Sequence, residues 1–157
     1  MKKNLLLPTL TTFLSSLALC LILSVSTGFT SKNPTPDETG QGIQFFEGTW
    51  QEALAKAKKE NKLIFLDANA SWCRPCKLME KRTFTDVNVG AFYNKNFINV
   101  KMDMEKGEGI ELSKKLGITA YPTLFFIDGN GTVSKKNIGY LDAEDFLTLG
   151  QNAKAKK

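Results

Sequence analysis

The stretch SWCRPCK, residues Ser71–Lys77, follows directly after the apolar run LIFLDANA, residues Leu63–Ala70. A short apolar run of this kind is typical of a central strand that is buried on both faces. A helix is expected to begin near Cys73, so the cysteine pair is predicted to lie where a strand gives way to a helix. Two cysteines separated by two residues form a redox pair, half of a zinc site or a structural disulfide.

The remaining residue types favour redox chemistry among these three. A structural zinc site needs four ligands, usually Cys and His, but the chain has no histidine and its one other cysteine is Cys20. A disulfide across two residues closes a very small loop and adds little stability. A thiol at a helix start is favoured as thiolate by the helix dipole, and Arg74 adds a positive charge beside Cys73. We therefore predict a redox pair in which Cys76 is the less exposed thiol, with no metal or other cofactor.

The charge distribution argues against nucleic-acid binding. The chain of 157 residues carries a formal net charge of +5. Five lysines lie near the two ends, namely Lys2, Lys3, Lys154, Lys156 and Lys157. Without them, 16 of the 21 basic residues remain and balance the 16 acidic ones. A basic face built to neutralise phosphates needs its lysines clustered on the fold, so no nucleic-acid partner is predicted.

Residues 1–30 have the layout of an export signal, in which two lysines precede an uncharged stretch from Asn4 to Ser31. The stretch is also long enough for a membrane anchor, and both interpretations stay open. The residues around Cys20 match a lipoprotein box poorly, because the residue before the cysteine is normally small and here it is Leu19. It is interpreted as an apolar residue, with lipidation as the alternative. In each case the rest of the chain is expected outside the cytoplasm, in the periplasm, soluble after cleavage or tethered to the membrane.

Three further segments follow. Residues 31–42 are rich in Pro, Gly and polar side chains and are predicted to be a flexible linker, and residues 152–157 are a basic tail. Residues 43–151 alternate between strand and helix patterns and are predicted to form one domain. The predicted strands are residues 43–46, 62–68, 97–103, 123–127 and 132–138. The predicted helices are residues 50–61, 73–84, a stretch capped by Thr85 or Asp86 and ending at Asn96, 109–116, and a last one from Asp142 to about Gln151. This order predicts an α/β fold with a mixed central sheet and helices on both of its faces.

Asp67, the motif Trp72–Lys77 and the tripeptide Tyr121-Pro122-Thr123 stand in the order and approximate spacing of the thioredoxin superfamily. The chain resembles that superfamily over about residues 43–151, which implies a thioredoxin-like fold. Within it, the stretch DANASWCRPCKLMEKRTFTD is most similar to the C-terminal periplasmic domain of thiol:disulfide interchange (DsbD) reductases.

The resemblance implies a role for each residue of the pair and for its neighbours. Cys73 is the attacking nucleophile, Cys76 the resolving thiol, and the two form a redox-active disulfide. Asp67 takes the proton of Cys76, and burial in an apolar strand is expected to raise the pKa of its carboxyl; a strand-end cap is the alternative. The resemblance also implies that Lys101 faces Asp67. The alternative is that Lys101 is a solvated strand residue.

Other residues are implied to line the site. Trp72 walls it, although plain packing explains an aromatic there equally well. Tyr121 precedes Pro122, which matches the cis-proline that presents backbone to an extended substrate. Arg74 and Pro75 separate the cysteines. Arg74 departs from the Gly-Pro dipeptide of thioredoxins, which leaves the reduction potential open.

The function implied is an exported enzyme that reduces protein disulfides. Its partners are protein disulfide clients and a membrane electron donor, since no nicotinamide supply is expected outside the cytoplasm. Pro75 before the second cysteine and the lack of a histidine between the cysteines favour reduction. Arg74 favours a disulfide oxidase or isomerase, because a stabilised thiolate makes the disulfide more oxidising. A non-catalytic binding module is the alternative from another class.

Overall fold

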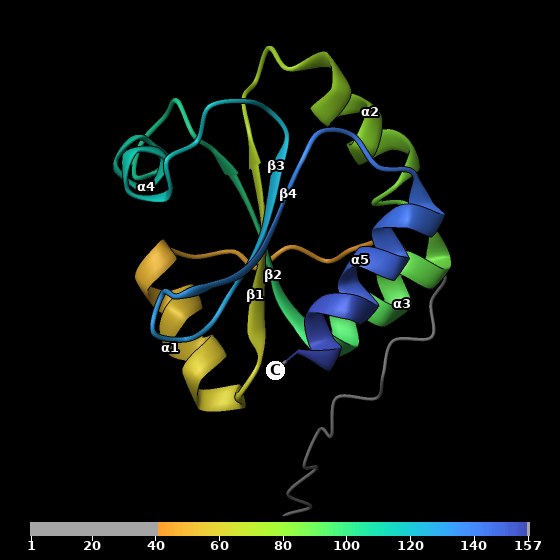
Figure 1. The fold of residues 1–157 in the computed structure, drawn as a ribbon, viewed down its shortest axis with the longest axis horizontal. Coiled ribbons are helices and arrows are strands. Elements are labelled where there is room, and N and C mark those ends of the chain that lie inside the picture. Colours follow the sequence, from red (N-terminus) through yellow and green to blue (C-terminus); the bar gives the residue numbers. More distant parts are fainter. Residues whose placement is uncertain (1–40, 157) are drawn as a thin grey trace, which may run out of the picture. The chain divides into compact units, whose positions relative to one another are not determined.

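The computed structural model describes residues 41–156, which belong to one compact unit (Figure 1). The predictions about residues 1–30, about Cys20 and about the linker as far as residue 40 lie outside the described residues. Within residues 41–156, no helix combines the length and the apolar composition needed to cross a bilayer.

The centre of the unit is a mixed sheet with the strand order β2-β1-β3-β4. Its strands are β1 (Leu63–Asn69), β2 (Phe97–Asp103), β3 (Thr123–Ile127) and β4 (Val133–Ile138). Strands β1 and β2 are parallel, whereas β3 runs antiparallel to β1 and β4 antiparallel to β3. This arrangement confirms the predicted α/β class with a mixed central sheet.

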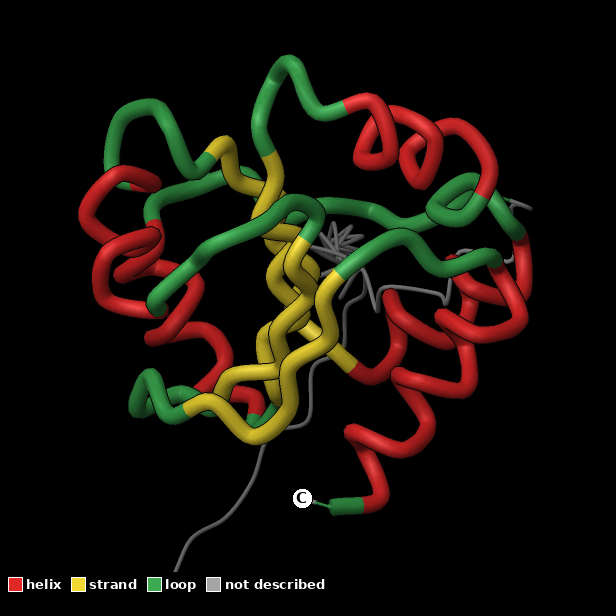
Figure 2. Tube along the Cα trace, turned by 45° about the horizontal axis from the view of Figure 1, so that its top comes forward, coloured by secondary structure: helices red, strands yellow, loops and turns green. Residues whose placement is uncertain are grey.

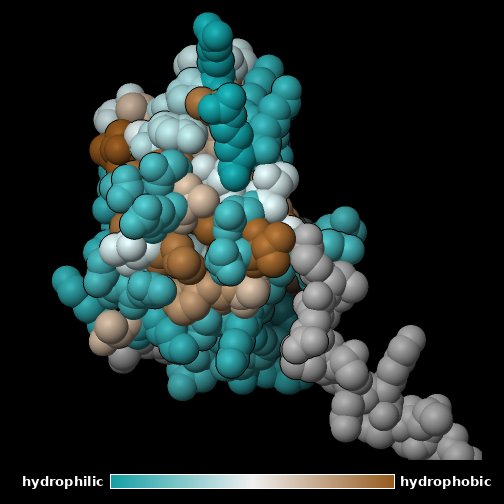
Figure 3. Space-filling model, turned by 90° about the vertical axis from the view of Figure 1, so that its right-hand side faces the viewer, coloured by the Kyte–Doolittle hydropathy of each residue, from teal (hydrophilic) through white to brown (hydrophobic). Residues whose placement is uncertain are grey.

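Helices cover both faces of the sheet, as predicted (Figures 1 and 2). They are α1 (Trp50–Glu60), α2 (Arg74–Arg82), α3 (Val87–Asn96), α4 (Gly109–Leu116) and α5 (Ala143–Ala155). Helices α1 and α4 pack on one face, and α2, α3 and α5 pack on the other. The surface on the side of α2, α3 and α5 is largely hydrophilic with hydrophobic patches between (Figure 3).

Strand β1 positions the site because all of its residues are buried. Side chains alternate along a strand, so Ile64 and Leu66 join the core under α1 and α4. Leu63 and Phe65 join the core under α2, α3 and α5. Asp67 continues this second series, which directs a carboxyl group from the middle of an apolar strand toward α2.

Local signals account for several of the helix ends. Thr49 and Glu52 form a capping box at the start of α1. Asp86 and Asp142 are the N-caps of α3 and α5, and their carboxylates accept backbone N–H bonds. Gly117 ends α4 in the left-handed conformation expected of a C-cap.

Two expectations about the elements are wrong. Residues 43–46 form no strand of the described sheet, although Phe46 N–H bonds to the Asn99 carbonyl of β2 at 2.7 Å. The reason is that side-chain amides take the place of a backbone ladder, since Gln44 N–H donates to Asn94 Oδ1 and Asn99 Nδ2 donates to the Gln44 carbonyl. Helix α5 continues past Gln151 to Ala155, because Ala153 is buried against the sheet.

Candidate active site

The two cysteines are joined in a disulfide at the start of α2, with an S–S distance of 2.03 Å. Cys73 is the N-cap residue, and its Sγ accepts a hydrogen bond from the Cys76 backbone N–H at 3.2 Å. Pro75 occupies the first turn, where a backbone N–H has no partner within the helix. The predicted junction between a strand and a helix is therefore present, and the N-terminus of α2 points at Cys73 Sγ.

The two cysteines are equally buried, with 2% of each residue exposed in this disulfide-bonded form. The expectation that Cys76 is the less exposed one is thus not met here. Ala70 packs with both cysteines and Tyr121 lies against the same cluster, which explains the burial of Cys73. What distinguishes the sulfurs is the helix N-cap contact of Cys73.

Asp67 is 1% exposed and lies inside β1, two residues before its end, so it is no strand-end cap. Its Oδ2 accepts a hydrogen bond from Asn69 Nδ2 at 3.2 Å, while its Oδ1 has no hydrogen bond within the described residues. Burial raises the pKa of the Asp67 carboxyl to about 7, against smaller lowering effects of Lys101 and Asn69. A carboxyl with this pKa exchanges protons at neutral pH.

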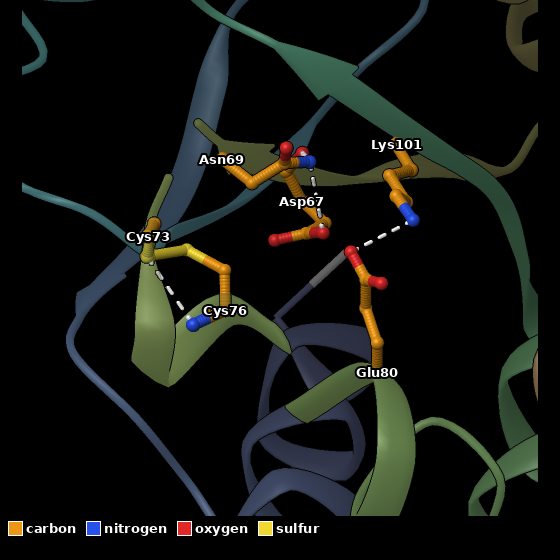
Figure 4. A network of polar contacts seen from close by, with 6 residues as sticks. All are labelled: Asp67, Asn69, Cys73, Cys76, Glu80 and Lys101. Atoms are coloured by element: carbon orange, nitrogen blue, oxygen red, sulfur yellow. Dashed lines mark hydrogen bonds and ion pairs between the residues drawn. A yellow bond between two sulfur atoms is a disulfide. The ribbon is translucent and has the colours of Figure 1, made fainter. Parts of the chain in front are cut away.

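Lys101 lies beside Asp67 in the register of β1 and β2, as the resemblance implied. It lowers the pKa of Asp67, but its ammonium forms an ion pair with Glu80 of α2 at 2.8 Å. Glu80 in turn raises the pKa of Asp67. Figure 4 shows the Asp67 carboxylate between the disulfide on one side and this ion pair on the other. Sequence reasoning gave Glu80 no role, although its spacing of four residues from Cys76 placed it on the same side of α2.

Trp72 is 66% exposed and packs edge-to-face on Tyr121, with ring centroids 5.9 Å apart. Its indole N–H donates to Glu105 at 2.8 Å, and Lys106 Nζ contacts Ser71 Oγ at 3.1 Å. The loop after β2 is therefore tied to the loop before α2. No pattern in the sequence pointed to Glu105, because its contact with Trp72 spans 33 residues.

The remaining predicted site residues lie directly before β3 and on the first turn of α2. The Tyr121–Pro122 peptide bond is cis, and Pro122 is buried directly before β3. Strand β3 pairs with β1, with Thr123 opposite Ala68. Arg74 is exposed on the first turn of α2. Within residues 41–156, no group of three His, Cys, Asp or Glu side chains is arranged to hold a metal ion.

A sequence model of the thioredoxin-like domain matches residues 50–154, which include the cysteine pair, Asp67 and Pro122. The chain belongs to the thioredoxin-like family. The resemblance inferred from the sequence is thereby confirmed, and the fold of this thioredoxin-like domain agrees with it.

Two curated relatives are similar to parts of this thioredoxin-like chain. It is 34% identical to the thiol:disulfide interchange protein DsbD of Yersinia pestis over 108 residues, which cover 67% of the chain and 18% of DsbD. It is 43% identical to spermatogenesis-associated protein 20 of Rattus norvegicus over 61 residues, which cover 39% of the chain and 8% of that protein. The chain thus spans less than a fifth of the length of either relative.

Solved structures match the domain more fully. A candidate disulphide-isomerase from Bacteroides thetaiotaomicron is 46% identical with a TM-score of 0.65, covering 72% of this chain and 93% of that one. The reduced C-terminal domain of DsbD from Neisseria meningitidis is 26% identical with a TM-score of 0.55, covering 66% and 92%. The thioredoxin-like chain is therefore similar to the C-terminal domain of DsbD, and it has a Cys-x-x-Cys pair.

Proposed function

We propose that this chain is an exported oxidoreductase that reduces protein disulfides through Cys73 and Cys76. The observation that carries the proposal is the buried Asp67 carboxyl, whose pKa of about 7 suits it to take and return a proton beside the disulfide. The likeness to DsbD, a thiol:disulfide interchange protein by name, adds support for thiol:disulfide exchange.

The exchange proceeds in two steps in the reduced protein. The Cys73 thiolate attacks one sulfur of a client disulfide, so that a bond from Cys73 to the client forms and the client S–S bond breaks. Cys76 then loses its proton to Asp67 and attacks Cys73 Sγ, which forms the Cys73–Cys76 disulfide and releases the second client thiolate. Two electrons pass to the client, and both of its thiolates take up protons.

The site stabilises the Cys73 thiolate by two means. The Cys76 backbone N–H that contacts Cys73 Sγ is directed at the developing charge, and the dipole of α2 acts in the same direction. Arg74 adds a positive side chain on the first turn. These features speed attack, but they also favour the reduced form of the pair and thus a more oxidising disulfide. A disulfide oxidase or isomerase is therefore the second candidate.

The compartment and the electron source complete the proposal. Residues 1–30 act as the export signal or anchor, which delivers the domain to the periplasm, either soluble or tethered to the membrane. A membrane protein supplies the electrons that reduce the Cys73–Cys76 disulfide there. DsbD, a thiol:disulfide interchange protein by name, is the relative that motivates this arrangement.

The reduction potential of the Cys73–Cys76 pair tests the direction of exchange. The protein is equilibrated in dithiothreitol or glutathione redox buffers, and the fraction of reduced thiols is read by alkylation and mass. A potential near that of thioredoxin, about −270 mV, supports the reductase. A value near about −120 mV overturns it in favour of an oxidase.

A further inference from the structure

The outer side of α2 carries a stripe of basic residues that begins between the two cysteines. Arg74, Lys77 and Lys81 are exposed and recur at spacings of three and four residues, which places them along one side of the helix. Pro75 and the exposed Leu78 lie among them. These five residues are called the basic face of α2.

The basic face of α2 lines a groove of about 510 Å³ whose exposed lining is mainly apolar. The buried cysteine Cys76 and Met79 occupy the opposite side of the helix. A segment lying in this groove would thus rest on apolar atoms of Pro75 and Leu78 with cationic groups at its rim. The groove lies on the side of the molecule where hydrophobic patches interrupt a hydrophilic surface (Figure 3).

The basic residues have no acidic partner within the described part of the chain. None of Arg74, Lys77 and Lys81 takes part in an ion pair among residues 41–156. The one carboxylate of α2, Glu80, is paired with Lys101 on the sheet side of the helix. The charge of the basic face is therefore uncompensated within the domain.

Helix stability does not account for this charge. A cation in the last turn of a helix is favourable, which accounts for Lys81, but a cation in the first turn opposes the helix dipole. Arg74 and Lys77 lie in the first turns of α2, and no acidic residue lies in the first turn. Their positive charge is costly to the isolated helix, and contact with an anionic partner would offset that cost.

We propose that the basic face of α2 is a docking surface for a protein partner that carries carboxylates beside its reactive cysteine. The proposal rests on the proposed function, because it concerns the partners of the same disulfide. A partner joined to Cys73 extends past Arg74 onto α2, where carboxylates meet Lys77 and Lys81 and an apolar side chain meets Leu78. Complementary charge of this kind raises the rate of encounter and selects among partners.

Two peptide disulfides serve as probes. Each is a dimer of one short peptide with a single cysteine, and the two differ only in carrying Asp or Ser at the four positions around that cysteine. The reduced full chain is mixed with each, and the rate constants are followed by stopped-flow. The readout is the ratio of the Asp rate to the Ser rate. A change in the thiolate of Cys73 affects both peptides alike and cancels in this ratio.

We expect the variant Lys77→Glu/Lys81→Glu to lower the ratio at least tenfold at low salt, and Lys77→Gln/Lys81→Gln to lower it about threefold. Both differences should vanish in 1 M salt, where the screening length is about 3 Å. Lys58→Glu/Lys59→Glu is the matched control, because it makes the same change of net charge on exposed positions of α1, across the sheet. It should keep the ratio of the unchanged protein.

Three outcomes overturn the docking surface. One is an unchanged ratio in both α2 variants. The second is an equal drop in the α1 control, which would reduce the effect to net charge. The third is a difference that persists in 1 M salt. If the reduced chain exchanges with neither peptide, the proposed thiol chemistry fails and the docking surface fails with it.

Discussion

The Lys101 ammonium lies 2.8 Å from the Glu80 carboxylate, and this ion pair joins β2 to α2 beside the buried Asp67. Its two members act on Asp67 in opposite directions, since Lys101 lowers the pKa of the carboxyl and Glu80 raises it. Burial remains the largest influence and holds that pKa at about 7. The ion pair therefore adjusts a proton acceptor that desolvation has already brought near neutral pH.

Glu80→Gln is expected to lower the pKa of Asp67. The substitution removes a negative charge near Asp67 and releases Lys101 from its ion pair, so that both changes favour the ionised carboxylate. The measurement is a carbon NMR titration of the Asp67 carboxyl in the disulfide form. Lys101→Met is the opposite case and should raise the same pKa. If both variants titrate like the unchanged protein, the ion pair has no influence on Asp67.

Asp67→Asn should make the protein more stable at alkaline pH and alter its stability little at pH 3.5. The pKa of Asp67 rises from 3.8 to about 7 on folding. The unfolded chain therefore loses this proton first, and the stability of the unchanged protein falls as pH rises from about 4 to about 7. A shift of about 3 units corresponds to on the order of 4 kcal/mol. Urea unfolding of the disulfide forms at pH 3.5 and pH 8 measures the difference.

Other carboxyl groups change the stability with pH in the opposite direction to Asp67. Backbone hydrogen bonds lower the pKa of Asp103 and Asp128, so their contributions are present above their unfolded pKa and are lost as pH falls. They occur in both proteins and cancel in the comparison. A stability difference between Asp67→Asn and the unchanged protein that is the same at both pH values would contradict the raised pKa of Asp67. Thiol exchange by Asp67→Asn should also slow near pH 7, since the amide cannot accept the Cys76 proton.

Glu105→Ala is expected to loosen Trp72 without unfolding the domain. The variant removes the acceptor of the indole N–H, but the contact is exposed, so the free energy of unfolding should change by less than about 1 kcal/mol. Quenching of tryptophan fluorescence by acrylamide should increase. The same substitution in a Trp72→Phe background leaves only the buried Trp50. An equal increase in the quenching of Trp50 in that background would mean that Glu105→Ala loosens the core and not Trp72 alone.

Much of the fold was predictable because its signals are local. The apolar run of β1 needs burial on both faces, and the caps Thr49, Asp86 and Asp142 each bond within three residues along the chain. The extended residues 43–46 were mistaken for a strand because their hydrogen-bond partners lie far along the chain. Whether Gln44 joins a ladder depends on Asn94 and Asn99, whose positions only the packed fold determines.

The same distinction holds at the site. The cysteine pair, its place at a helix start and the buried carboxyl of Asp67 follow from short motifs, and the cis bond at Pro122 came from the family resemblance. Glu80 and Glu105 were missed as participants, because their roles arise from contacts with Lys101 and Trp72 across the fold. Tyr121 was expected at the site, but its packing with Ala70 against both cysteines is a contact across the fold that the sequence alone does not give.

Cys76→Ser is expected to trap covalent complexes with client proteins, whereas Cys73→Ser is expected to trap few. The two cysteine residues are equally buried in the disulfide form, so exposure alone does not assign the attack. The N-cap position does, because the Cys76 backbone N–H and the start of α2 stabilise a thiolate on Cys73. Without the Cys76 thiol, the mixed disulfide on Cys73 has no internal group to resolve it.

The complexes should appear as high-mass bands on non-reducing gels of cells expressing each variant and should collapse with dithiothreitol. The double variant Cys73→Ser/Cys76→Ser sets the background, since it retains the fold residues but neither thiol of the pair. Equal trapping by the two single variants would contradict the assignment of Cys73 as the attacking thiol. In Cys73→Ser the one remaining thiol of the pair is Cys76, which lacks the N-cap contact. Bands no stronger than the double variant for both, with each protein folded, would favour a binding module over an oxidoreductase.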